Sequence, residues 1–520
     1  MAHRRRRAAA GHPVVFELVV ADEAPERAGP REPSSVPGAA TDADRAADRT
    51  WHAWRLGVPV GLVGLVGAVL LVGGIVDAGR DEGRLGQATA ALAPLPAEPA
   101  PTWTVDVALD GVVERWGALV TLHEGTAVAR DVATGEERWS ARVGDGADCG
   151  QVDGRAPATP GTDPLVCVAG AGGERTVVVL DRDGEEVARR DLTVGGGSVE
   201  PGADGTVLVA RRTGEPVDAR ALLPYGWTAD EQVEVPGGRG ADVVAQDAVT
   251  GEERWRTRLA FLAPANIWEC VGFSDDTAVV DVDRLEVSTV GGLVHVDGCG
   301  VGADLTSAGV RLDVPGSPDA VVPLEDGTYL RTAPGDGTGS GPVRGRGGTG
   351  AGGDVVLDGS GEQVWRAPGS LLVPGASDGS SARTRLVRTQ DGLAAFGTDG
   401  AERWRDLQDA DRVLVQTVDT AVLLEGGDVT AVDLATGERR WEHEVDDGWQ
   451  VESAFTDGDR AVLWTTSAGN LEGERSRVTA YDLGDGDRAW RVGSSRIRES
   501  VVAVDGSLLR VTDDGVARLG

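Results

Sequence analysis

The residues with the clearest chemical potential are four cysteines in a chain of 520 residues. No two of them have the CxxC spacing, and they stand at Cys149, Cys167, Cys270 and Cys299. A zinc site needs ligands clustered in pairs, and none of the six histidines lies near such a pair. The simplest pairing is local, Cys149 with Cys167 and Cys270 with Cys299, and two such disulfides would indicate an oxidising compartment. The alternative is four buried free thiols.

No other group of residues predicts catalysis. The sequence lacks HExxH, GxSxG and P-loop motifs, and His123, His295 and His443 are isolated. Glu442 and Glu444 flank His443 on an expected strand, which favours a solvated charged pair. None of the Asp-x-Asp pairs matches a full EF-hand loop, so turn chemistry explains them better than calcium: Asp181 with Asp183, Asp281 with Asp283, and Asp485 with Asp487. We therefore predict no catalytic, cofactor-binding or metal-binding residue.

One segment is predicted to cross a membrane. Residues 58–76 carry no charge, and a helix of this length at 1.5 Å per residue covers about 28 Å, close to the hydrocarbon thickness. The segment starts too far along the chain for an ordinary cleaved signal peptide, so we interpret it as an uncleaved signal anchor. Arginines concentrate before it, which predicts a single-pass membrane protein with its N-terminus inside and its bulk outside.

The regions on either side of this span are poor in large apolar residues. Residues 1–57 are expected to form a disordered cytoplasmic tail, because so little apolar surface cannot offset the entropy lost on ordering. Residues 77–102 end in a run of Ala and Pro, which predicts a stiff stalk that holds the rest of the chain away from the membrane.

The charge of the chain excludes one class of partner. The net charge is -34, and the sequence contains no Lys, so every basic residue is Arg. A field of this sign repels phosphate backbones and anionic lipid headgroups. We therefore expect no nucleic-acid partner, and we attribute most of the acidity to solubility.

A spaced motif recurs beyond residue 103. It has Gly four and Trp eight residues after an Asp, and four copies keep this spacing although Trp fills only 14 positions in the chain. The four copies are Asp131, Gly135 and Trp139; Asp247, Gly251 and Trp255; Asp433, Gly437 and Trp441; and Asp482, Gly486 and Trp490. Degenerate copies begin at Asp181, Asp297, Asp358 with Trp365, and Asp399 with Trp404. Such self-similarity is typical of a propeller or a solenoid.

Each copy of the motif predicts a hairpin. Alternating apolar residues precede the Asp, the Asp side chain can bond its own turn, and Gly accepts a positive φ. A second turn upstream adds further antiparallel strands, so we predict an all-β fold of about eight four-stranded propeller blades over residues 103–520. Trp103 has no motif before it, and the C-terminus stops where a Trp-bearing strand should follow. Trp103 is therefore expected to supply the outer strand of the last blade.

One low-complexity segment interrupts this pattern. Residues 335–353 are rich in Gly and are expected to form a flexible insertion loop inside one blade. The segment contains a GxGxxG match at Gly345, Gly347 and Gly350, but a strand pattern follows it in place of the helix that a dinucleotide site requires. We attribute this match to chance.

The repeats resemble those of the PQQ-like β-propeller family. The whole chain looks like a membrane-anchored bacterial member of that family, of actinobacterial type. In that family the Trp side chains dock between blades, which implies a structural role for Trp103, Trp139, Trp255, Trp365, Trp404, Trp441 and Trp490. The family contains quinoprotein dehydrogenases, scaffolds similar to the outer-membrane assembly lipoprotein, and extracellular sensor domains. The dehydrogenases hold their quinone beside adjacent cysteines, which this sequence lacks, and its only asparagines are Asn266 and Asn470.

These observations favour a non-catalytic scaffold in the cell envelope. The sequence has a full fold signature and no catalytic one, so we expect it to bind an envelope protein, a glycan or a small ligand without a cofactor. Two alternatives stay open. One is a PQQ-dependent dehydrogenase, and the other is an extracellular ligand sensor that signals through its tail.

Overall fold

The computed structural model describes part of the chain, namely residues 88–95, 99–106, 111–150, 163–216, 237–264, 267–274, 277–315, 320–332, 353–380, 383–406, 408–467, 475–495, 499–512 and 514–520. The chain divides into two compact units, Met1–Ile75 and Val76–Gly520, and every described residue belongs to the second. The predicted tail and the predicted span at residues 58–76 lie outside the described residues. Among the described residues, no helix is long and apolar enough to cross a membrane.

The second unit is built from β-sheets, as predicted. Its described residues contain no α-helix and one 3-10 helix, η1 at Ile267–Cys270. The first sheets along the chain are β2 to β5 (Gly111–Arg115, Ala118–His123, Thr126–Asp131, Glu137–Arg142), β6 to β8 (Leu165–Ala169, Glu174–Leu180, Glu186–Thr193) and β9 to β12 (Gly197–Pro201, Thr206–Arg212, Ala241–Asp247, Glu253–Leu259).

Three further sheets occupy the middle of the chain. They are β13 and β14 (Val271–Ser274, Thr277–Val280), β15 to β17 (Leu285–Val290, Leu293–Gly298, Val301–Thr306) and β18 to β21 (Val321–Pro323, Tyr329–Arg331, Val355–Leu357, Gln363–Arg366). The predicted Gly-rich insertion falls between β19 and β20 of one sheet, and its residues 335–352 lie outside the described part of the chain.

Four sheets complete the unit. They are β22 with β24 to β26 (Ser370–Leu372, Thr384–Thr389, Gly392–Gly397, Glu402–Asp406), β23 with β27 to β30 (Pro374–Ser377, Arg412–Gln416, Thr420–Glu425, Asp428–Asp433, Arg439–Glu444), β31 to β34 (Trp449–Thr456, Arg460–Ser467, Ser476–Asp482, Arg488–Ser494), and β35 to β37 (Glu499–Val504, Ser507–Thr512, Gly515–Leu519) with β1 (Pro101–Asp106). Neighbouring strands are antiparallel, except that β23 runs parallel to β27.

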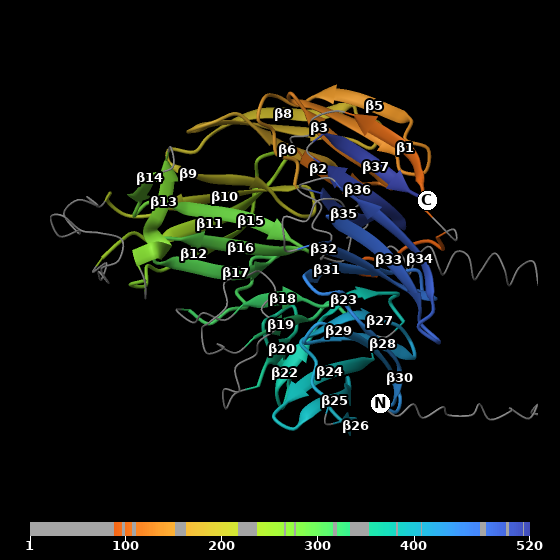
Figure 1. Ribbon diagram of the computed structural model, residues 1–520. Coiled ribbons are helices and arrows are strands. Elements are labelled where there is room, and N and C mark those ends of the chain that lie inside the picture. Colours follow the sequence, from red (N-terminus) through yellow and green to blue (C-terminus); the bar gives the residue numbers. More distant parts are fainter. Residues whose placement is uncertain are drawn as a thin grey trace, which may run out of the picture. The chain divides into compact units, whose positions relative to one another are not determined.

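The last sheet is shared by the two ends of this unit. Figure 1 shows β1, in orange, beside β37, in blue, and Trp103 lies opposite Arg518 in their antiparallel register. This confirms the prediction that Trp103 supplies the outer strand of the last sheet. Because β1 pairs with β37, the edge of β37 that faces away from β36 is not left unpaired.

The predicted count of about eight blades is not confirmed. Among the described residues, seven sheets have four or five strands, two have three, and β13 with β14 form a sheet of two. Successive sheets pack through apolar faces. Leu208 and Val243 of one sheet, for example, share a buried cluster with Val287 and Val296 of another.

The outermost strands carry mostly exposed charged residues. Pairs of opposite charge three residues apart recur along them: Glu186 with Arg189, Glu253 with Arg256, Glu402 with Arg405, and Arg439 with Glu442. Charges on a sheet edge disfavour pairing with a strand of another molecule. In the outer strands that contain a Trp, the Trp ring packs against the next sheet.

The N-terminal part of the unit departs from the stalk prediction. Residues 88–95 are largely buried, with Leu92 only 1% exposed and Leu95 9% exposed. Both leucines belong to the largest apolar cluster, together with Phe455, Val415 and Leu508. The stalk prediction therefore does not hold for these residues, which we call the N-terminal strap.

Candidate functional site

The Asp of the repeated motif organises its own turn. Asp131 Oδ1 accepts hydrogen bonds from the backbone N–H groups of Ala133 and Thr134, each at 3.0 Å. Asp433 makes the same pair of contacts with Ala435 and Thr436. Gly135 and Gly437 have φ values of 74° and 78°, which a Cβ would oppose. The turn therefore needs both the Asp and the Gly.

An Arg that follows the Gly fixes the second oxygen of the same Asp. Arg138 lies 2.6 Å from Asp131 Oδ2, and Arg440 lies 2.6 Å from Asp433 Oδ2. In the copy at Asp247 the partner is Arg254, at 2.7 Å. This hydrogen bond is the main reason why the pKa of Asp247 falls to about 2. The motif carboxylates thus act in local structure.

Most of these Gly residues make room for a Trp from the preceding sheet, whereas Gly251 faces Arg190. A methyl group placed on Gly437 would lie 2.7 Å from the Trp404 ring, and one on Gly486 would lie 2.6 Å from the Trp441 ring. The same relation joins further pairs: Trp103 with Gly135, Trp139 with Gly184, Trp255 with Gly309, and Trp365 with Gly400. The Gly therefore serves the turn and the packing between sheets at once.

The indole N–H groups bind the same turns. Trp404 Nε1 donates to the carbonyl of Leu434 at 2.7 Å, and Trp441 Nε1 donates to that of Leu483 at 3.1 Å. In both cases the acceptor is the residue after the motif Asp. Trp103, Trp139 and Trp255 make equivalent bonds to Val132, Arg182 and Ser307. A buried Trp N–H usually finds such a partner.

One repeat without Trp shows what replaces it. Ala188 stands four residues after Gly184, where Trp would be, and Arg190 covers the next turn in its place. Its Nε donates to Ala248 at 3.0 Å, and both terminal nitrogens lie 3.2 Å from Gln246 Oε1. Burial is the main cause that lowers the Arg190 pKa. No feature of the motif predicts this substitution.

The predicted turn at Asp297 is wrong. Asp297 lies within β16, opposite Gly302 of β17. The turn that receives Trp255 runs instead from Thr306 to Gly309, with Thr306 in the place of Asp. Gly309 has no Trp four residues later, so the spacing gave no signal for it.

Trp490 differs from the other docking residues. It is only 5% exposed, and its Nε1 has no hydrogen-bond partner within the described part of the chain. The sheet beyond it is the one divided between β37 and β1, and no turn joins these two strands. The acceptor that other repeats provide is therefore missing at this seam.

Both predicted disulfides are confirmed. Cys149 is bonded to Cys167 and Cys270 to Cys299, and all four residues are buried. The first bond links Cys149, which lies before β6, to Cys167 within β6. The second ties η1 to the turn between β16 and β17.

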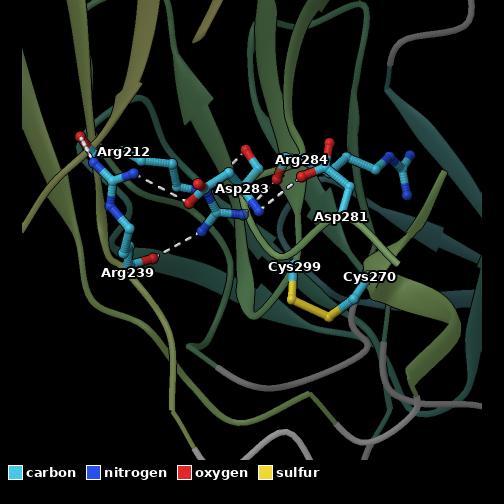
Figure 2. The surroundings of a disulfide bond; sticks show 7 residues. All are labelled: Arg212, Arg239, Cys270, Asp281, Asp283, Arg284 and Cys299. Atoms are coloured by element: carbon cyan, nitrogen blue, oxygen red, sulfur yellow. Dashed lines mark hydrogen bonds and ion pairs between the residues drawn. A yellow bond between two sulfur atoms is a disulfide. The ribbon is translucent and has the colours of Figure 1, made fainter. Parts of the chain in front are cut away.

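Charged residues brace the loops beside the second disulfide. Figure 2 shows Arg212 and Arg239 next to Asp283, with Arg239 Nη1 3.1 Å from Asp283 Oδ1. Arg212 is 7% exposed and donates to three backbone carbonyls, those of Arg239 at 2.8 Å, Asp283 at 3.5 Å, and Arg284. Burial is the main cause that lowers its pKa. Since Arg212 comes from β10, it links two neighbouring sheets.

Two carboxyl groups on inner strands have strongly raised pKa values. Burial, followed by the charge of Asp505, raises the pKa of Glu114 to about 7, although a hydrogen bond with the Asp505 backbone opposes this. Burial, followed by the charge of Asp148, raises the pKa of Glu200 to about 8. Each pair joins two neighbouring sheets. Neither pair is predictable from the sequence, because both depend on residues distant along the chain.

His295 takes part in a second contact between sheets. Its Nδ1 lies 2.7 Å from Asp304 Oδ1, and this hydrogen bond is the main cause that raises the His295 pKa. Ser288 stands opposite His295 on β15, but no hydrogen bond joins the two among the described residues. Asp304 Oδ2 accepts from the N–H of Val321 at 3.2 Å in the next sheet. The pair therefore connects β17 to β18.

His443 is not the solvated residue that we predicted. Its ring stacks on Tyr481 with centroids 4.8 Å apart, and its Nε2 lies 2.6 Å from the Gly486 carbonyl. It thus packs beside Trp441 against the next turn. The described residues contain no group of three His, Cys, Asp or Glu arranged to hold a metal ion.

Comparison with known proteins gives a family match for part of the chain. Residues 339–467 match a family model described as PQQ_2, outer membrane protein assembly factor BamB. No curated protein matches the sequence.

Several solved structures superpose on this chain with low TM-scores. BamB from Moraxella catarrhalis is 13% identical, with a TM-score of 0.36, and the match covers 81% of this chain and 99% of that one. Quinohemoprotein alcohol dehydrogenase from Comamonas testosteroni is 13% identical, with a TM-score of 0.32, covering 82% and 78%. AztD from Citrobacter koseri is 12% identical, with a TM-score of 0.27, covering 67% and 88%.

Proposed function

We propose that this chain, a member of the PQQ-like β-propeller repeat family, is a non-catalytic scaffold that binds a protein partner in the cell envelope. The match to an assembly-factor family is the observation that carries the proposal. The motif supports it, since its Asp, Gly and Trp residues all act in the turns and in packing the sheets. A fold of this kind leaves function to its loops.

The proposal includes an extracytoplasmic location and a single membrane anchor at residues 58–76. The two disulfides support that location, because such bonds persist in oxidising compartments. The absence of Lys offers a direct test. A single Lys introduced as Arg258→Lys, at a side chain that is 77% exposed, provides one side-chain amine for a reagent that cannot cross membranes.

Labelling of intact cells should modify Arg258→Lys and should leave Arg27→Lys, in the predicted tail, unmodified until the cells are lysed. The unmodified side chains contribute no reactive Lys, so the unsubstituted chain reports the background. Labelling of the tail variant in intact cells would reverse the proposed orientation. Labelling of both only after lysis would place the scaffold on the wrong side of the membrane.

The scaffold role is tested by cross-linking the tagged full chain in its native membranes. We expect recovery of an envelope protein at a level well above an untagged control. The same preparation is assayed for oxidation of alcohols and sugars with added PQQ and calcium. Turnover, or a rise in melting temperature when PQQ is added, would refute the non-catalytic role, because a ligand that binds the folded state stabilises it. Recovery of a glycan or small ligand alone would refute a protein partner.

A further inference from the structure

The N-terminal strap is held mainly by its backbone. The N–H of Leu92 donates to the carbonyl of Thr456 at 2.7 Å, and the N–H of Ala93 donates to that of Gly506 at 2.7 Å. The strap carbonyls of Thr89 and Ala90 accept from the N–H groups of Ser377 and Thr456 at 2.8 and 3.3 Å. Ala91 and Leu92 form parallel bridges with Thr456 and Gly506. Bonds of this kind bind an extended peptide with little regard to its side chains.

Two charged side chains hold the ends of the strap. Glu325 Oε1 accepts from the N–H of Thr89 at 2.9 Å, and Arg460 Nη1 donates to the carbonyl of Leu95 at 2.9 Å. Asp457, whose side chain is 3% exposed, lies 3.6 Å from Arg460 and orients it. An acceptor at one end and a donor at the other fix the direction in which a peptide chain can lie.

Most side chains of the strap are buried, and two neighbouring ones are exposed. Ala91, Leu92 and Leu95 are buried, whereas Ala93 and Pro94 face outward. Leu92 and Leu95 enter an apolar cluster that includes residues of β27, β31 and β36. Main-chain bonds that give affinity, combined with buried side chains that give specificity, are the properties of strand-addition peptide recognition.

We infer that the surface formed by Glu325, Ser377, Thr456, Arg460 and Gly506 is a peptide-recognition site, which the strap occupies as an internal ligand. Its partner is an extended segment of an envelope protein with small residues, then Leu, then Leu three residues later. The inference rests on the proposed function only in naming an envelope protein as the source of that segment. Because the strap is tethered, it competes at a high effective concentration, and a partner must bind more tightly to replace it.

The test makes the strap exchangeable without changing it. A protease recognition sequence is inserted between Pro96 and Ala97 of the full chain, and the purified protein is cleaved there. A fluorescent peptide of residues 87–96 is then added, and its binding is followed by anisotropy. The cleaved protein should bind the peptide in exchange for its own strap, whereas the uncleaved protein should not. Failure of the cleaved protein to bind would overturn the inference.

Matched peptides test the specificity of the surface. Leu92→Asp and Ala93→Asp add the same charge at neighbouring positions, one buried and one exposed. We expect the first change to reduce affinity at least a hundredfold and the second to have less than a threefold effect. In the protein, Glu325→Ala and Arg460→Ala should each weaken binding by roughly tenfold or more, since hydrogen bonds to charged groups are strong. Equal binding of the two peptides would refute the specificity.

A final arm separates this inference from the proposed function. An excess of the 87–96 peptide is added to the cleaved protein before cross-linking in membranes, and capture of the partner should fall. Unchanged capture would show that the partner binds elsewhere and would overturn the inference while the scaffold role stands. Absence of any partner, with peptide exchange intact, would overturn the scaffold role alone. Exchange of straps between two copies into a stable dimer would show a second copy, and not an envelope protein, to be the partner.

Discussion

Replacement of Glu114 by Gln should remove part of the pH dependence of stability. The pKa of Glu114 rises from 4.5 to about 7 on folding, mainly through burial. Between these values the folded state binds a proton that the unfolded state has lost, so the free energy of unfolding falls as pH increases. Below pH 4.5 both states are protonated, and above pH 7 both are ionised. The loss of stability therefore develops only between these two limits.

The size of the effect follows from the position of the two pH values. At about pH 5.5 the folded carboxyl is still neutral, and at about pH 8 it is ionised. The stability therefore falls over roughly 1.5 pH units, from about pH 5.5 to the folded-state pKa of about 7. At about 1.4 kcal/mol per unit, wild type should lose about 2 kcal/mol relative to Glu114→Gln over this interval. Gln resembles the protonated acid and does not titrate, so its other effects on stability cancel in the comparison.

Urea unfolding followed by Trp fluorescence, with the disulfides intact, measures this difference. The matched control is Glu444→Gln, on the exposed face of the outer strand β30, whose effect should be the same at both pH values. The effect of Glu114→Gln on the free energy of unfolding could change by less than about 0.5 kcal/mol between the two pH values. That result would refute the reasoning, because the pKa of Glu114 would then not be raised by folding.

Three further predictions concern packing, and unfolding free energies check each of them. Gly437→Ala and Gly448→Ala both place a Cβ at a positive φ, but only Gly437 faces a Trp ring, so it should cost about 1–3 kcal/mol more; equal costs would contradict the docking role of Trp404. Arg190→Lys should cost about 1–3 kcal/mol, because Lys lacks the planar guanidinium that bonds Ala248 and Gln246. Arg189→Lys, in the adjacent exposed ion pair, should cost less than about 0.5 kcal/mol. The reverse order would refute the replacement of Trp by Arg190. Loss of either disulfide through paired Cys→Ser changes should lower the free energy of unfolding by about 3 kcal/mol. An unchanged free energy of unfolding would show that the bond does not form in the protein.

The repeated motif could be read from the sequence because its residues act locally. Asp131 bonds the N–H groups that follow it, and Gly135 supplies the φ that the same turn needs. The Trp belongs to the same strand pair, so its spacing is also fixed locally. The structure refines this spacing, since Trp follows Gly by four residues even where the Asp moves, as at Gly361 with Trp365 and Gly400 with Trp404.

The features that sequence reasoning missed depend on residues far apart in the chain. Arg190 acts as a docking residue only because the turn at Asp247 lies against it. Burial, and then the charge of Asp148 from another sheet, raise the pKa of Glu200. The stalk prediction for the strap rests on its Ala and Pro, which by themselves indicate a stiff spacer. The burial of Leu92 and Leu95 becomes clear only when Phe455 and its neighbours are placed around them.

The turns that contact the strap and the turns of the motif lie at the same ends of the sheets. The first serve recognition, and the second serve folding. In an antiparallel sheet of four strands, the turn between the first two strands and the turn between the last two lie at one end. The motif turns hold neighbouring sheets together, whereas Glu325 and Gly506 stand in turns between first and second strands and contact the strap. A change at Glu325 should therefore alter strap affinity without disturbing the Trp contacts. A change at Gly437 should weaken the sheets while the strap surface keeps its chemistry.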